Sequence, residues 1–102
     1  MDKDATFTQV PNRILEAMYA TENKITGMQF RVLIYVIREM YGFHEFNKLI
    51  SVNRMAEKLG KDRRMVYRAI KDLEAMGIIK VSHSTGTKPS LFAICDPSEW
   101  SC

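Results

Sequence analysis

The residues of this chain best suited to a chemical role lie in one basic helical segment that begins at residue 63. At about 100° per residue, one arc of this segment carries cations and an aromatic ring: Arg63, Arg64, Tyr67, Arg68 and Lys71. The opposite arc is apolar: Met65, Val66, Ala69, Ile70, Leu73 and Met76. Guanidinium and ammonium groups bind phosphates and the edges of guanine bases. The segment therefore predicts a helix with one face in a core and the other on a polyanion.

The residues before this segment predict a shorter helix and a tight turn. Ser51 is placed to cap the shorter helix, whose apolar side is Met55, Ala56 and Leu59. Gly60, Lys61 and Asp62 form the turn, and Asp62 is placed to cap the basic helix. Gly77 stands where a left-handed residue ends a helix. This order is typical of a helix-turn-helix, whose second helix enters the major groove of DNA.

A β-hairpin is predicted directly after the basic helix. Residues 78–83 alternate as a strand, residues 84–88 are turn formers, and residues 90–94 return as a second strand. We therefore expect a mainly α fold with a small β-hairpin, namely a winged helix-turn-helix. Lys88 at the tip of the wing is a candidate contact to a phosphate or the minor groove, or else a solvated lysine. Together with the five residues of the basic arc and Lys61 in the turn, it makes up seven candidate DNA contacts.

Two helices are expected ahead of this unit. Asn12 is placed to cap a short helix with the apolar positions Ile14, Leu15, Met18 and Tyr19. Thr26 is placed to cap a longer helix over residues 27–40. Its predicted buried stripe is Phe30, Leu33, Ile34, Ile37 and Met40, widened by Val32 and Val36. A loop over residues 43–49 then leads to a short strand near Ile50.

Length and charge fit one DNA-binding domain. The 102 residues suffice for a single modest core, with residues 1–6 and 97–102 expected as loose tails and Trp100 packed on the domain. Residues 48–88 carry ten lysines and arginines against four acidic residues, a local charge of +6 within a total of +3. A basic middle between near-neutral flanks favours a localised polyanion-binding surface.

Other function classes find little support in the sequence. We recognise no phosphate-binding glycine loop, nucleophile–base pattern or carboxylate cluster, so we expect neither an enzyme nor a cofactor. Cys95 and Cys102 form no metal motif, and free thiols without a signal sequence favour the cytoplasm. No apolar run approaches the roughly 18 residues of a transmembrane helix.

Together these pieces resemble the N-terminal domain of the bacteriophage replication protein O family, the origin-binding initiators of lambda-like phages. The resemblance covers roughly residues 7–100. It rests on residues 10–18, 29–33, 37–43, 69–73, 77–80 and 98–100. Its most specific element is the block from Arg38 through Tyr41 and Gly42 to Phe43. We interpret Arg38, Tyr41 and Phe43 as structural, with the aromatic rings closing the core beneath the wing.

The resemblance implies binding to repeated sites in a phage replication origin. It also implies that a separate C-terminal region engages the host replicative helicase or its loader. Because this sequence stops at Cys102, we expect that role to lie elsewhere, whether the chain is an excised domain or a short protein. The target sequence stays open, since the turn from Lys61 to Arg64 is more basic than the family leads us to expect.

Several alternatives remain at this level. Arg63, Arg64 and Arg68 suit either guanine or phosphate, while Tyr67 suits either a DNA contact or shielding of the helix. Besides origin recognition, the same surface fits a phage transcriptional repressor. A winged helix that binds only protein is disfavoured, because its face would be more apolar. Pairing of two copies on DNA is expected through residues 7–31, with Tyr19, Met28 and Phe30 as candidate contacts unless they are core.

Overall fold

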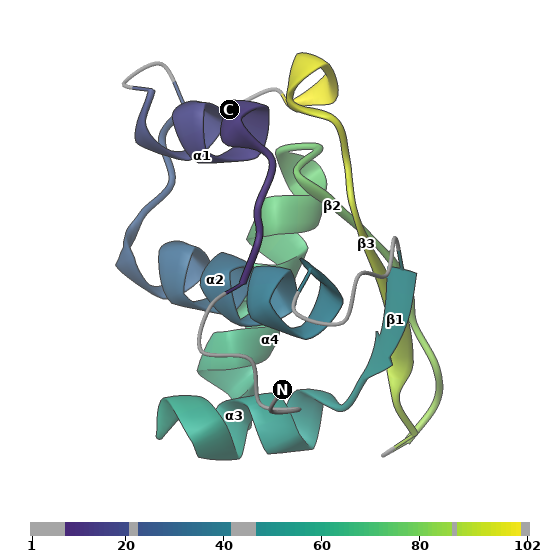
Figure 1. The fold of residues 1–102 in the computed structure, drawn as a ribbon. Helices are drawn as coiled ribbons and strands as arrows, with labels where there is room; N and C mark the ends of the chain where they lie inside the picture. Colours follow the sequence, from purple (N-terminus) through teal and green to yellow (C-terminus); the bar gives the residue numbers. More distant parts are fainter. Residues whose placement is uncertain (1–7, 21–22, 42–46, 87, 101–102) are drawn as a thin grey trace.

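The computed structural model describes residues 8–20, 23–41, 47–86 and 88–100, and Figure 1 shows helices packed against one small sheet. The predictions for residues 1–6, Phe43 and Cys102 lie outside these ranges. The elements in chain order are α1 (Asn12–Tyr19), α2 (Gly27–Tyr41), β1 (Asn47–Ile50), α3 (Val52–Leu59), α4 (Arg63–Ala75), β2 (Ile79–Ser82), β3 (Ser90–Ile94) and the 3-10 turn η1 (Pro97–Glu99). The described chain is thus mainly helical with a three-stranded antiparallel sheet.

The sheet contains more than the predicted hairpin. Its strand order is β1-β3-β2, so the returning strand β3 lies in the centre and pairs with both neighbours. The prediction of a loop as far as Leu49 was wrong, because β1 already begins at Asn47 and pairs there with Ala93. Such pairing is non-local, and four residues give little strand signal of their own.

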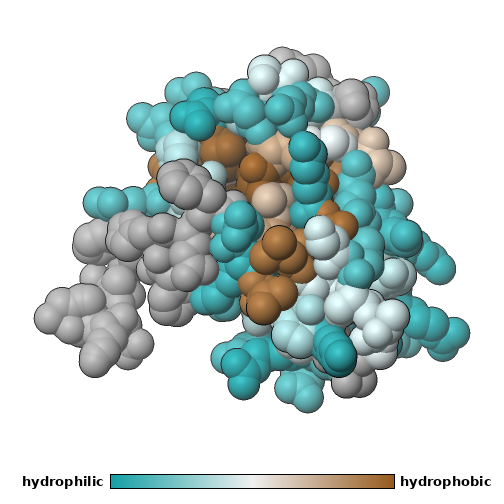
Figure 2. Space-filling model, turned by 90° about the vertical axis from the view of Figure 1, so that its right-hand side faces the viewer, coloured by the Kyte–Doolittle hydropathy of each residue, from teal (hydrophilic) through white to brown (hydrophobic). Residues whose placement is uncertain are grey.

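The sheet has one face in the core and one in solvent. Ile50, Ile79 and Phe92 are buried, whereas Leu49 and Leu91, which lie opposite each other across β1 and β3, are exposed. Figure 2, turned towards the side on which β1 lies, shows hydrophobic residues gathered in the middle of a hydrophilic face. This alternation follows from the two-residue side-chain period of a strand.

The long helix α2 is central to the core, but it is rotated from the predicted position. Val32, Leu33, Val36, Ile37 and Met40 are buried. Two residues assigned to the buried stripe are exposed instead: Phe30 by 38% and Ile34 by 46%. On a helical wheel the buried residues span one arc, and Phe30 and Ile34 lie beyond its edge. Apolar residues cover so much of this helix that the sequence pattern did not fix its inner face.

The first helix also differs in detail from its prediction. Pro11 is the N-cap residue and its carbonyl accepts from the Ile14 and Leu15 N–H groups, so Asn12 is the first helical residue and not the cap. Ile14 and Met18 are buried as their spacing indicated. The remaining two apolar positions, Leu15 and Tyr19, are exposed. A helix of eight residues at the edge of the molecule buries only one narrow side.

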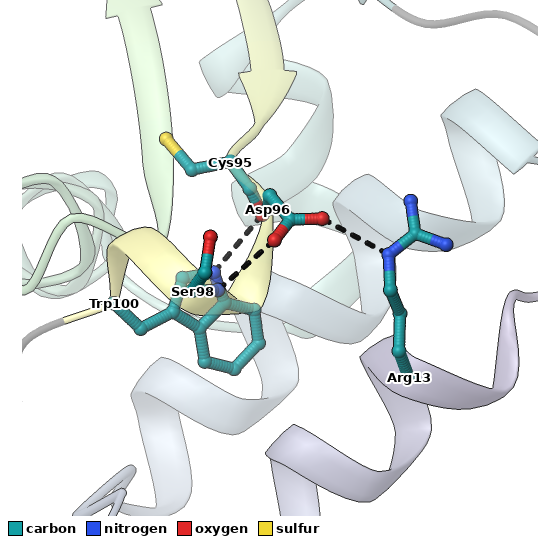
Figure 3. Close-up of polar contacts among 5 residues, drawn as sticks. All are labelled: Arg13, Cys95, Asp96, Ser98 and Trp100. Carbon is teal, nitrogen blue, oxygen red and sulfur yellow. Dashed lines mark hydrogen bonds and ion pairs between the residues drawn. The ribbon is translucent and has the colours of Figure 1, made fainter.

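The C-terminal segment from residue 97, where the sequence led us to expect a loose tail, forms the 3-10 turn η1 beside α1 (Figure 3). Asp96 accepts hydrogen bonds from the Ser98 N–H and from Nε of Arg13, the latter at 3.0 Å. The indole N–H of the buried Trp100 donates to the Cys95 carbonyl at 3.0 Å. Trp100 therefore packs on the domain as predicted.

Tyr41 also belongs to this end of the molecule. It is half-buried beside the core, and burial raises the pKa of its hydroxyl group, with nearby charges on Arg13 and Asp96 acting in opposite directions. A structural role fits this position. However, Asp96 follows the end of β3 that is remote from the 83–89 turn, so Tyr41 does not lie beneath that turn as predicted.

Candidate nucleic-acid interface

The connection between α3 and α4 is fixed by local hydrogen bonds. Ser51 Oγ accepts from the Arg54 N–H at 3.2 Å, and Asp62 Oδ1 accepts from the Arg64 N–H at 3.0 Å. Gly60 has a φ of 66°, and the N–H of Lys61 donates to the Ala56 carbonyl. A left-handed residue at this point favours glycine, since a side chain would be strained there. Both predicted caps and the predicted turn are confirmed.

The two faces of α4 separate largely as the sequence indicated. Val66, Ala69, Ile70 and Leu73 are buried, and α4 packs against α2 and α3. The five candidate residues of the opposite face are all exposed: Arg63, Arg64, Tyr67, Arg68 and Lys71. Met65 was assigned to the core and is 48% exposed instead. It lies at the edge of the apolar arc and in the first turn of the helix.

The cations of this face have few acidic partners. The Nε atom of Arg64 lies 4.0 Å from the Asp62 carboxylate, and both side chains are largely exposed. Among the residues that the structure describes, no carboxylate forms an ion pair with Arg63, Arg68 or Lys88. Exposed cations without intramolecular partners are available to an external anion.

A groove of about 630 Å³ lies between this face and the turn that joins β2 and β3. Its lining comes from α3, α4 and the turn: Val52, Asn53, Arg63, Arg64, Tyr67, Arg68, His83, Ser84, Gly86, Lys88 and Ser90. The groove thus brings together five of the seven predicted site residues. Lys61 and Lys71 are exposed but do not line it.

Contacts at one side of the groove join α4 to the β2–β3 turn. The imidazole Nε2 of His83 donates to the Glu74 carboxylate, with distances of 3.0 and 3.1 Å to its two oxygens. The Tyr67 ring meets the His83 ring edge-on at 5.8 Å between centroids. The Lys71 ammonium group lies 5.7 Å from the Tyr67 ring centre. Tyr67 therefore lines the groove and also packs on its neighbours, a position that fits both predicted roles.

The turn itself has a defined shape. Ser84 Oγ donates to the Lys88 carbonyl at 2.6 Å, and the Ser84 N–H donates to Ser90 Oγ at 3.2 Å. Gly86 has a φ of 64°, a conformation that favours glycine. These bonds hold the backbone of Lys88 in place beside the groove.

Four polar groove residues were missed at the sequence level: Asn53, His83, Ser84 and Ser90. Ser84 and Ser90 shape the turn, so their signal was the turn composition. The position of Asn53, one residue inside the N-terminus of α3, was a second signal, because the first turn of a preceding helix can approach DNA phosphates. His83 had no such signal in the sequence, because it meets Glu74 only in the folded chain.

The sequence places the chain in a known family. None of the curated proteins matches the chain. The model of the family described as bacteriophage replication protein O matches residues 1–91. The chain belongs to this family. The resemblance inferred from the residue blocks is therefore confirmed over most of the chain, and the family indicates a role in phage DNA replication. The matched region includes α3, α4 and the whole groove, whereas Trp100 lies beyond it.

A metal site, a reactive thiol or a membrane-spanning helix would each point to a different function. No group of three or more histidine, cysteine, aspartate or glutamate residues there is arranged to hold a metal ion. Cys95 is a buried free thiol, and burial raises its pKa, which disfavours the reactive thiolate. No helix in the described ranges is long and apolar enough to cross a bilayer.

Proposed function

We propose that this protein is a winged helix-turn-helix that recognises specific double-stranded DNA at a phage replication origin. The observation that carries the proposal is the groove, where Arg63 and Arg68 of α4 and Lys88 of the β2–β3 turn face one space, none of them in an ion pair with a described carboxylate. Family membership supports the replication role. In this proposal α3 and α4 form the helix-turn-helix, and the β2–β3 turn is the wing.

Each part of the surface then has a distinct task. The N-terminal half of α4 enters the major groove, so Arg64 and Arg68 are placed to reach guanine edges. Lys61 and Lys71, which lie outside the groove of the protein, contact flanking phosphates. Binding of this kind needs no cofactor and no bond-making step, so we propose no enzymatic activity. The expected site of action is the cytoplasm of the bacterial host.

Selection from a random duplex library tests the proposed specificity. The protein is expected to enrich one sequence family, and that sequence should recur within the replication origin of the parent phage. Enrichment of a promoter sequence instead would favour the repressor alternative. Failure to retain any duplex at low salt would contradict DNA binding altogether.

We also propose that two copies bind one origin site, because a single helix-turn-helix covers only a half-site. Exposed apolar side chains within the predicted pairing region support this: Tyr19 is 74% exposed, and Phe30 is also accessible. Met28 contacts the core and is a weaker candidate. Sedimentation with a single full site is expected to give two proteins per duplex. A saturated complex with one protein per duplex would contradict pairing.

A further inference from the structure

The groove has the electrostatic character of a phosphate site. It is lined by three arginines and Lys88, and none of its lining residues among those described is acidic. Arg63, Arg68 and Lys88 form no ion pair with a described carboxylate. A concave surface lined by one sign of charge focuses the field and attracts the opposite charge.

The position of the groove relative to α4 indicates which part of a DNA duplex the groove can hold. If α4 lies in the major groove of a duplex, a sugar–phosphate backbone borders it on each side. The β2–β3 turn stands beside α4, and the protein groove separates the two. The DNA strand that passes α4 on the side of the β2–β3 turn must then run between α4 and that turn. The base edges face α4 with its Arg64 and Arg68, so the part of the groove away from α4, beside Asn53 and Lys88, receives the backbone.

We infer that this groove holds the sugar–phosphate backbone of one DNA strand, with Asn53 and Lys88 contacting phosphates from its α3 and hairpin sides. The inference rests on the proposed duplex binding. Asn53 lies at the second position of α3, where backbone N–H groups lack intrahelical acceptors. Its amide group accepts no hydrogen bond from, and donates none to, the described residues. A helix start beside a cationic groove thus offers neutral donors on the side opposite Lys88.

The groove is also formed before DNA binds. The Glu74–His83 pair joins α4 to the start of the turn, and the two Ser84 hydrogen bonds fix the turn behind Lys88. A groove of fixed width lowers the ordering cost of binding. Because phosphates carry no sequence information, the contacts of Asn53 and Lys88 are expected to strengthen binding to all duplexes equally.

Methylphosphonate scanning of a half-site duplex tests the inference. Each phosphate on each strand is replaced in turn by the neutral group, and affinity is measured for wild type, N53A and K88A. In wild type, replacements at a few adjacent phosphates of one strand should each weaken binding by about three- to tenfold. One of these losses should disappear in K88A and another in N53A, with both positions on the same strand.

The matched control is K58A, which removes an exposed lysine of α3 that does not line the groove. It should keep the wild-type pattern of sensitive phosphates. Sensitive positions on opposite strands, or losses that persist unchanged in both N53A and K88A, would overturn the inference while leaving duplex binding intact. Absence of duplex binding by the wild type would instead contradict the proposed function itself.

Discussion

The Glu74 carboxylate of α4 and the His83 imidazole, which follows β2, lie 3.0 Å apart and join the basic helix to the hairpin. They are nine positions apart in sequence, with the Gly77 turn and β2 between them. Both side chains are largely withdrawn from solvent, with 25% and 30% exposed. This contact holds the start of the turn that bears Lys88 against α4.

Removing this contact should loosen the hairpin turn while the core stays folded. In Glu74→Ala the His83 ring loses its hydrogen-bond partner, so the turn is expected to open more often. Amide exchange at Ser84, whose N–H is bonded to Ser90 Oγ, should accelerate by severalfold. The amide of Phe92 in the central strand serves as the internal control. Equal rates at Ser84 in wild type and variant would contradict the positioning role.

Specificity is expected to depend on the first half of α4. Replacing Arg64 or Arg68 by alanine should cost about 1–3 kcal/mol on the selected duplex if that arginine holds a guanine through two hydrogen bonds. The loss on random DNA should be smaller. Parallel titrations of both duplexes measure the difference, and equal losses would assign the arginine to phosphate.

How far the sequence could predict this site depends on how local each feature is. The caps at Ser51 and Asp62 and the left-handed Gly60 are set by neighbouring residues, and the structure has them as predicted. The groove is different, since it needs α3 and the hairpin on either side of α4. Nothing near Asn53 or His83 in the sequence indicates that they share a surface.

The distinction between local and non-local features also explains where the observed fold differs from the predicted one. A helical wheel of α2 does not show whether Ile34 or Val36 is buried, because apolar side chains extend around more than half of that helix. The buried face of α2 is set by its packing against α4. Likewise β1 depends on pairing with β3, which lies some forty residues later.

Trp100 should be a major source of stability although it follows the region matched by the family. Trp100→Ala removes a buried indole and is expected to lower the free energy of unfolding by about 3 kcal/mol. Trp100→Phe keeps most of the ring but leaves the Cys95 carbonyl without its donor, at a cost of about 1 kcal/mol. Denaturant titration measures both, and a change near zero in Trp100→Ala would contradict its packing role.

Asp96 should make the stability of the fold depend on pH in the acid range. Hydrogen bonds from Ser98, and then the bond and charge of Arg13, hold the pKa of this carboxyl group below its usual 3.8. A lowered pKa in the folded state stabilises the fold above the unfolded value, and this stabilisation is lost as pH falls through the folded pKa. Wild type should therefore exceed Asp96→Asn in stability at pH 6, with the difference shrinking below pH 4. A difference that does not change with pH would contradict this assignment.

The central claim, that the cationic surface around α4 binds DNA through phosphates, is tested most directly by the salt dependence of duplex affinity. Release of counterions makes the logarithm of the association constant fall linearly with the logarithm of salt concentration. If about six cations among Lys61, Arg63, Arg64, Arg68, Lys71, Lys80 and Lys88 neutralise phosphates, the slope should be about −5. A slope near zero, or no binding at low salt, would contradict the claim.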